Sequence, residues 1–154
     1  SNNVSQPVVP VIVEEKKLID YLKKQTPENS VILYNVPSYK DRPAVMSALS
    51  GRKSFLSMAE LLNAIYDISL EERIYDFWTL LNCSCKEENP KVFFDKYPFV
   101  NYVALYDRGF HKPMTPFGGV EAYAFAVKTE FQNSPWFKPV FSTGMITLYK
   151  VQRQ

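Results

Sequence analysis

Short apolar runs alternate along this chain with longer segments of mixed polarity, and this alternation limits the possible folds more than any other feature. The run Val31–Tyr34 is four residues long and is bounded by turn-forming residues. A run this short and this apolar is typical of a strand that is buried on both faces. Lys53–Leu56 and Val100–Tyr106 are two further runs of strand type. We therefore expect three buried strands, separated by other elements.

The segments between these runs have the periodicity of amphipathic helices. In residues 14–25, Leu18, Ile19 and Leu22 fall on one face of a helix, with lysines around it. Asn89–Pro90 offers an N-cap residue followed by a proline at the first helical position. Further helices are expected at residues 44–49, 57–65, 69–81, 89–97 and 120–131.

Two capping boxes give the clearest helix starts. In Ser57–Glu60 and Ser69–Glu72, a serine is followed three residues later by a glutamate. The serine oxygen can accept a hydrogen bond from the N3 amide, while the glutamate reaches back to the N-cap amide. Gly51 is expected to end the helix at residues 44–49, because glycine adopts the left-handed conformation that closes many helices.

The order of these elements predicts an α/β fold. Strands separated by helices favour a parallel sheet with right-handed crossovers. Residues 138–142 and 145–151 flank Thr143-Gly144, which predicts a closing β-hairpin. We expect a mostly parallel, Rossmann-like sheet in three layers, with helices on both faces and a C-terminal antiparallel hairpin. A chain of 154 residues fits one such domain.

The first 13 residues do not read as part of this domain. The chain begins Ser1-Asn2, which resembles a protease scar left by removal of an expression tag. Val4–Val13 contains Pro7 and Pro10 and has no helical periodicity, so it is predicted to be an extended linker, with a flexible natural terminus as the alternative. The single α/β domain is placed at residues 14–154.

Charge and hydropathy argue against a nucleic-acid partner and against a membrane span within these residues. The 18 basic and 16 acidic residues are interspersed and give a net charge of +2, so no clustered basic face for nucleic acid is expected. No apolar run approaches the roughly 20 residues of a membrane span, which predicts that the domain itself is soluble.

No complete catalytic, cofactor or metal motif is present. The glycine-rich dinucleotide and P-loop patterns and the nucleophile elbow are all absent. His111 is the single histidine, so a zinc site with four ligands is not expected. Cys83 and Cys85 are two residues apart, a spacing that does not suit a relaxed disulfide, and we expect two free thiols. The sequence predicts no catalytic residue, no metal ligand and no cofactor.

Most acidic residues have a simple explanation at the starts of helices. Negative charge suits the first turn of a helix because of the helix dipole. The residues explained in this way are Glu14, Glu15, Glu60, Glu71 and Glu72. Asp41 and Asp107 differ, because each lies in a loop that follows a predicted strand.

These loops suggest a ligand site, since ligands of open α/β sheets bind beyond the carboxyl ends of the strands. The polar residues placed near that edge are Asn35, Tyr39, Asp41, Arg42, Asp107 and Arg108. A carboxylate beside an arginine there could bind a sugar or a phosphate, or could form a structural ion pair in a loop. Arg52 follows Gly51 and opens a strand. It is expected either to contact an anion or carbohydrate, or to hydrogen-bond nearby carbonyls.

Several short motifs resemble one class of membrane protein. The matching segments are Thr26–Leu33, Arg42–Ser57, Val100–Val103, Trp136–Phe141, Gly144 and Ile146–Val151. Together they are similar to the C-terminal soluble region of polytopic membrane proteins of the glycosyltransferase type that use lipid-linked sugars, and of their uncharacterised relatives. The resemblance spans most of residues 14–151. Gly51 and Arg52 match a recurrent position of that class, but one without a defined role.

The resemblance implies an extracytoplasmic domain that is tethered to membrane helices through Val4–Val13. Its main partner would be the membrane-embedded part of its own chain, and a glycan or lipid-linked sugar could be a second partner. Catalysis would belong to the membrane part, where the acidic catalytic residues of such enzymes lie, so no catalytic residue is assigned to this chain.

Three functions remain open at this point. The leading hypothesis is a non-catalytic accessory domain that packs on the membrane part or assists substrate binding. A stand-alone enzyme or ligand-binding protein would use the loops around Asp41, Arg42, Asp107 and Arg108. A protein–protein interaction module would use exposed aromatic residues and would present an apolar patch of several hundred Å².

Overall fold

The computed structural model describes residues 11–35, 42–55, 68–82, 88–106 and 132–154, and the structural statements below concern these ranges. Helices precede and separate the first three strands, as the sequence predicted. The elements are α1 (Val13–Gln25), β1 (Val31–Tyr34), α2 (Arg42–Ser50), β2 (Lys53–Ser54), α4 (Leu70–Asn82), α5 (Glu88–Lys96), β3 (Tyr102–Tyr106), β4 (Phe137–Ser142) and β5 (Ile146–Val151).

The strands form one five-stranded sheet in the order β2-β1-β3-β5-β4. β1 lies between β2 and β3 and pairs in parallel with both; Leu33 is opposite Val103. β5 pairs with β3 in the antiparallel direction, and β4 lies outside β5. The predicted parallel sheet with a C-terminal antiparallel hairpin is therefore confirmed, with three of the five strands in the parallel part.

The hairpin is closed by a threonine. The Thr143 amide donates to the Ile146 carbonyl at 2.7 Å, and the Thr143 hydroxyl oxygen accepts from the Ile146 amide at 2.9 Å. The outer strand β4 contains Pro139, and the register of its pairing with β5 shifts between Pro139 and Phe141. A shift of this kind is a bulge, which bends and twists the strand locally.

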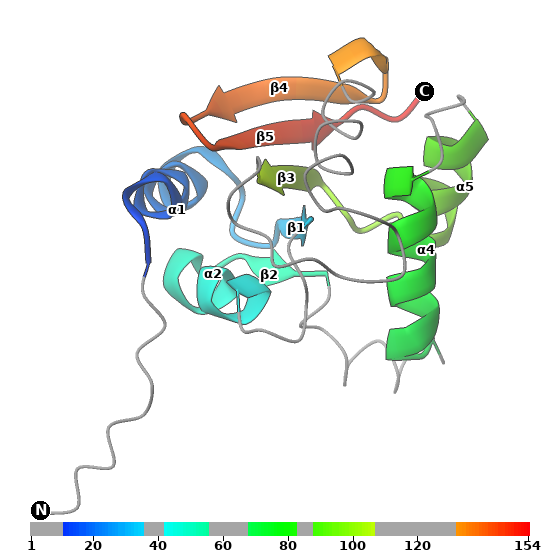
Figure 1. The fold of residues 1–154 in the computed structure, drawn as a ribbon, viewed down its shortest axis with the longest axis horizontal. Coiled ribbons are helices and arrows are strands. Elements are labelled where there is room, and N and C mark those ends of the chain that lie inside the picture. Colours follow the sequence, from blue (N-terminus) through cyan, green and yellow to red (C-terminus); the bar gives the residue numbers. More distant parts are fainter. Residues whose placement is uncertain (1–10, 36–41, 56–67, 83–87, 107–131) are drawn as a thin grey trace, which may run out of the picture.

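Helices cover both faces of the sheet (Figure 1). Alternate residues of a strand point to opposite faces, so each strand contributes to two separate cores. On one face, side chains of α1 and α2 pack against side chains of the strands. The buried residues of this core are Leu18, Ile19, Leu22, Ile32, Tyr34, Met46, Tyr102, Ala104, Tyr106, Ile146 and Leu148. On the other face, side chains of α4 and α5 pack against the strands. Buried residues of this second core include Val31, Leu33, Phe55, Phe77, Leu80, Phe93, Phe94, Tyr97, Val103, Leu105, Tyr149 and Val151. The three-layer prediction is confirmed.

Several helix boundaries follow the predicted signals. Gly51 has a φ of +68° and its amide bonds to the Ser47 carbonyl, so it ends α2 as expected. The Ser69 hydroxyl oxygen accepts from the Glu72 amide at 3.0 Å, which is the serine half of the predicted capping box. The glutamate half is not formed among the described residues, because the Glu72 carboxylate lies 3.3 Å from Lys96 Nζ instead. α5 begins at Glu88, two residues before Pro90, where the predicted N-cap Asn89 would place the first helical residue.

Some predictions fall outside the described residues. They are the helices expected at residues 57–65 and 120–131, the thiols Cys83 and Cys85, the loop residue His111 and most of the linker in residues 1–13.

Candidate functional site

The carboxyl end of β1 is joined to β3 by a side chain. Asn35 directly follows β1, and its carboxamide forms two hydrogen bonds with the backbone of Tyr106, the last residue of β3. Asn35 Oδ1 accepts from the Tyr106 amide at 2.7 Å, and Asn35 Nδ2 donates to the Tyr106 carbonyl at 3.2 Å. The side chain therefore extends the pairing of the two strands past their ends. Asn35 is buried, and its carboxamide oxygen and nitrogen are both used in this way.

A buried carboxylate lies beside this edge, and we call Glu15, Arg42 and Tyr106 the closed cluster. Glu15 projects from α1 on the same face as Leu18 and Leu22, toward the sheet. Its Oε2 accepts from the Tyr106 hydroxyl at 2.7 Å, and its Oε1 accepts from Arg42 Nη2 at 2.7 Å. The side chains of Glu15 and Arg42 are only 1% and 13% exposed, so this ion pair is shielded from water.

The electrostatics of the closed cluster favour a fixed structure. Burial raises the pKa of the Tyr106 hydroxyl, and the charge of Glu15 raises it further. Burial also raises the pKa of Tyr34, on the neighbouring strand. The hydroxyl therefore stays protonated and donates to Glu15, while Arg42 balances the carboxylate charge. This arrangement joins α1, α2 and the end of β3.

The seven residues predicted to bind a ligand do not all lie together. Asn35 and Arg42 both lie beside Tyr106 at the carboxyl edge. Arg52 immediately precedes β2, at the amino end of the parallel strands. The other four residues, Tyr39, Asp41, Asp107 and Arg108, lie outside the described residues.

Arg52 is buried and hydrogen-bonded to carbonyls at the end of α1. Its Nη2 donates to the carbonyl oxygens of Lys23 at 3.1 Å and Thr26 at 2.9 Å, and its Nε donates to the Thr26 hydroxyl at 3.0 Å. Carbonyls at a helix C-terminus lack partners within the helix and carry partial negative charge. Arg52 thus caps α1, which agrees with the structural alternative considered for it.

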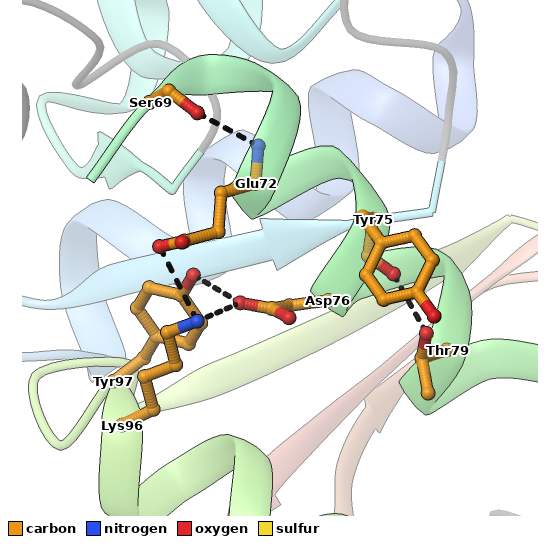
Figure 2. A network of polar contacts seen from close by, with 7 residues as sticks. All are labelled: Ser69, Glu72, Tyr75, Asp76, Thr79, Lys96 and Tyr97. Carbon is orange, nitrogen blue, oxygen red and sulfur yellow. Dashed lines mark hydrogen bonds and ion pairs between the residues drawn. The ribbon is translucent and has the colours of Figure 1, made fainter.

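A second carboxylate cluster lies on the opposite face of the sheet, between α4 and α5 (Figure 2). We call Glu72, Asp76, Lys96 and Tyr97 the open cluster. Asp76 Oδ2 accepts from the Tyr97 hydroxyl at 2.5 Å and lies 2.7 Å from Lys96 Nζ. The hydrogen bond to Asp76 raises the pKa of Lys96, and burial raises the pKa of Tyr97. The side chains of Lys96 and Asp76 are 39% and 21% exposed, so this pair meets solvent.

A hollow of about 80 Å³ adjoins the open cluster. Its lining residues come from both helices and are Tyr75, Asp76, Thr79, Leu80, Asn89, Val92, Phe93 and Lys96. Tyr75 and Val92 are 71% and 68% exposed, while Leu80 and Phe93 are buried. The hollow thus combines exposed apolar residues, buried apolar residues and polar residues from both helices.

Arg73 is a buried charge that the sequence did not single out. It lies on α4, four residues before the core residue Phe77, and it is completely buried. Its Nη1 donates to the Phe55 carbonyl at 3.0 Å, but Nε and Nη2 have no hydrogen-bond partner in the described part of the chain. Burial lowers its pKa. Its helical spacing from Phe77 was the available signal, because residues four apart share a helix face.

The sequence explained Glu15 only in part. Its carboxylate does interact with the start of α1, since it accepts from the Ile12 amide at 3.3 Å, but the side chain is buried and not on the helix surface. The same residue lies three positions before Leu18 and seven before Leu22, on the stripe that faces the sheet. This spacing was the signal for an inward-facing carboxylate.

Within the described ranges, no three or more histidine, cysteine, aspartate or glutamate side chains are grouped to hold a metal ion. None of the helices described here is long and apolar enough to cross a bilayer.

Neither a protein-family model nor a curated protein sequence matches the chain. Its fold is similar to a solved structure, the C-terminal globular domain of an oligosaccharyltransferase from Archaeoglobus fulgidus. The TM-score is 0.58, and the match covers 94% of this chain and 100% of that one, at 10% sequence identity. Identity this low carries the fold and not the activity.

Proposed function

We propose that this chain is a non-catalytic accessory domain of a membrane-bound glycosyltransferase that uses lipid-linked sugars. The observation that carries the proposal is the fold similarity to the C-terminal globular domain of an oligosaccharyltransferase, which extends over almost the whole of both chains. The sequence motifs support the same class of parent protein. An oligosaccharyltransferase is, by its name, an enzyme that transfers sugar chains.

The domain would act by packing on the membrane-embedded part of its own chain, on the extracytoplasmic side, or by assisting the binding of a glycan or lipid-linked substrate there. The carboxyl edge of the sheet is a candidate for this contact, because the segments that follow β1, β2 and β3 all leave from it. In open α/β sheets, ligands and partners bind at such an edge. The closed cluster would hold that edge rigid.

The ligand-binding alternative has less support at this edge. Asn35 uses its carboxamide oxygen and nitrogen to pair β1 with β3, and Arg42 forms an ion pair with Glu15. Both side chains are therefore committed to contacts inside the domain. A ligand site would depend on the predicted residues Tyr39, Asp41, Asp107 and Arg108.

The full-length gene product gives the first test. Several membrane helices directly before residue 4 would support the proposal, and a full-length protein without membrane helices would contradict it.

A transfer assay gives the second test. Membranes that contain the full-length protein would be supplied with a lipid-linked oligosaccharide and an acceptor peptide, and compared with membranes in which residues 14–154 are deleted. We expect transfer by the intact protein and at least about a tenfold loss on deletion at equal protein level, since ordered substrate contacts contribute strongly to rate. No transfer by the intact protein would contradict the class of parent, and unchanged transfer after deletion would contradict the accessory role.

A further inference from the structure

We propose that the hollow between α4 and α5 binds a single uncharged sugar ring, which lies against Tyr75 and is hydrogen-bonded by Asp76, Thr79 and Asn89. The site is on the opposite face of the sheet from the closed cluster. It does not rest on the proposed function, because a sugar ring can bind here whatever the parent protein does.

The walls of the hollow present an aromatic ring to solvent. Tyr75 is 71% exposed on α4, and Val92 faces the same hollow from α5. Exposing an aromatic ring costs hydrophobic free energy, and rings left exposed beside a concave surface are common in binding sites. A pyranose ring has an apolar face of C–H groups that can pack against such a ring, with its hydroxyls directed to the sides.

Polar atoms with unused hydrogen-bonding capacity lie beside this wall. Both partners of Asp76, the Tyr97 hydroxyl and Lys96, contact Oδ2, so Oδ1 has no hydrogen-bond partner in the described chain. The carboxamide of Asn89 likewise has none among the described residues, although it offers two donors and an acceptor. The Thr79 hydroxyl donates to the Tyr75 carbonyl at 2.9 Å, which leaves its oxygen able to accept.

This set of atoms suits hydroxyl groups. A hydroxyl both donates and accepts, so it can donate to Asp76 Oδ1 or Thr79 Oγ1 while accepting from the Asn89 amide. Lys96 Nζ lies 2.7 Å from Asp76 and 3.3 Å from Glu72, so the open cluster keeps one negative charge. An anion is therefore disfavoured, and the hydroxyl groups of a neutral ligand can donate to Asp76 Oδ1.

The size of the hollow indicates one ring. Its volume of about 80 Å³ is several times the roughly 10–15 Å³ that a single buried water needs. It is well below the roughly 300 Å³ at which pockets for drug-sized ligands begin. One sugar unit, at the end of a glycan or within it, could lie in the hollow while the rest of the glycan stays in solvent.

An extended peptide is the less suitable occupant. Peptides bound as strands need an exposed sheet edge with free backbone groups. The hollow lies between two helices, and the backbone groups within a helix are already hydrogen-bonded to one another.

Saturation-transfer NMR on this 154-residue chain tests the inference. The probes are the methyl glycosides of glucose, galactose, mannose and N-acetylglucosamine, each at up to about 100 mM, because single-ring ligands bind with Kd values of roughly 1–10 mM. We expect at least one glycoside to receive saturation, most strongly at its ring C–H protons. The absence of saturation for all four glycosides would overturn the inference.

Substitutions at the exposed wall locate the site without disturbing the core. Tyr75→Ser and Asn89→Ala should each weaken binding by at least about tenfold, the change that corresponds to one lost contact of about 1.4 kcal/mol. Tyr75→Phe keeps the ring and should retain binding. Leu49→Ala, at a half-exposed apolar residue on α2, is the matched control and should bind as the unchanged protein does.

Two further outcomes would count against a sugar site here. Equal binding by Tyr75→Ser and the unchanged protein would place the sugar elsewhere. Saturation of an apolar tripeptide such as acetyl-Ala-Pro-Val-amide, lost in Tyr75→Ser, without saturation of any glycoside, would identify a protein-binding surface instead.

Discussion

The closed and open clusters contain the same chemical parts in two environments. In each, a carboxylate accepts a hydrogen bond from a tyrosine hydroxyl and lies 2.7 Å from a cationic nitrogen. Glu15 and Arg42 are shielded between the helices and the sheet, whereas Asp76 and Lys96 meet solvent beside the hollow. The two pairs therefore differ mainly in their access to water.

Access to water decides what each cluster can contribute. A buried ion pair holds its geometry strongly, because removing one partner leaves a charge that water cannot reach. An exposed pair is screened by water and contributes about 0–1 kcal/mol, so its atoms can change partners at little cost. The difference suggests that the closed cluster supports the fold, while the open cluster is free to take part in binding.

The largest effect is expected for Glu15→Gln. The substitution keeps the shape of the side chain but leaves the guanidinium of Arg42 without its charged partner, so the free energy of unfolding should fall by about 3 kcal/mol. Urea unfolding at neutral pH measures the loss. Glu14→Gln, at the neighbouring residue in the same turn, is the control and should change stability by less than about 0.5 kcal/mol. Equal losses of unfolding free energy in the two variants would show that the buried ion pair stabilises the fold no more than an ordinary first-turn carboxylate does.

Alkaline pH should act on both clusters, because each contains a buried tyrosine side chain. Burial raises the pKa of Tyr97 and of Tyr106 above the usual value of about 10. The folded protein therefore holds these protons more tightly than the unfolded chain does. Their stabilising contribution is present below about pH 10 and is lost as the pH rises further, by about 1.4 kcal/mol per pH unit for each tyrosine.

Unfolding by urea between neutral pH and strongly alkaline pH measures this slope. Tyr106→Phe and Tyr97→Phe should each make it shallower, and Leu49→Ala should shift the curve without changing its slope. A slope that both tyrosine variants leave unchanged would contradict the assignment of the buried hydroxyls.

Arg73 tests whether a buried charge stabilises the fold only when it has a charged partner. It is a buried cation without a carboxylate partner among the described residues. Arg73→Met should raise the free energy of unfolding by about 1 kcal/mol, because methionine fills the space without burying a charge. Arg52→Met is the matched control: this buried arginine caps α1, and its loss should destabilise the protein by about 2 kcal/mol. Thermal unfolding distinguishes the two, and destabilisation by both would show that Arg73 has a further acceptor besides the Phe55 carbonyl.

The smallest effect is expected for Asp76→Asn in the open cluster. The amide can still accept from Tyr97, and the lost pair with Lys96 is exposed, so stability should change by no more than about 1 kcal/mol. The change should shrink further at high salt, which screens exposed pairs. Urea unfolding at two ionic strengths measures it. A loss as large as that of Glu15→Gln would mean that burial is not what separates the two clusters.

Local sequence patterns predicted much of the fold. Val31–Tyr34 is the strand that its apolar run indicated, and Gly51 and Ser69 mark a helix end and a helix start as expected. These features depend on neighbours within a few residues, so one sequence is enough to recognise them. The start of α5 differs from its signal: Asn89-Pro90 predicted a helix from Pro90, and α5 begins at Glu88.

The polar clusters could not be predicted in the same way. Glu15 meets Tyr106 across 91 positions of sequence, and nothing local to either residue indicates the other. The Glu72 side chain had two possible partners, the N-cap amide of its own helix and Lys96 on α5, and only the packing of the helices decides between them. Contacts between distant elements depend on how those elements pack, which local periodicity does not specify.

The two edge strands of the sheet affect the tendency of the protein to aggregate at high concentration. One border is β2, only two residues long, and the other is β4, which Pro139 and the adjacent bulge interrupt. Short strands, prolines and bulges at an edge hinder a strand of another molecule from adding to the sheet. In the part of the chain that the structure describes, both edges of the sheet are therefore poor templates for amyloid-like stacking.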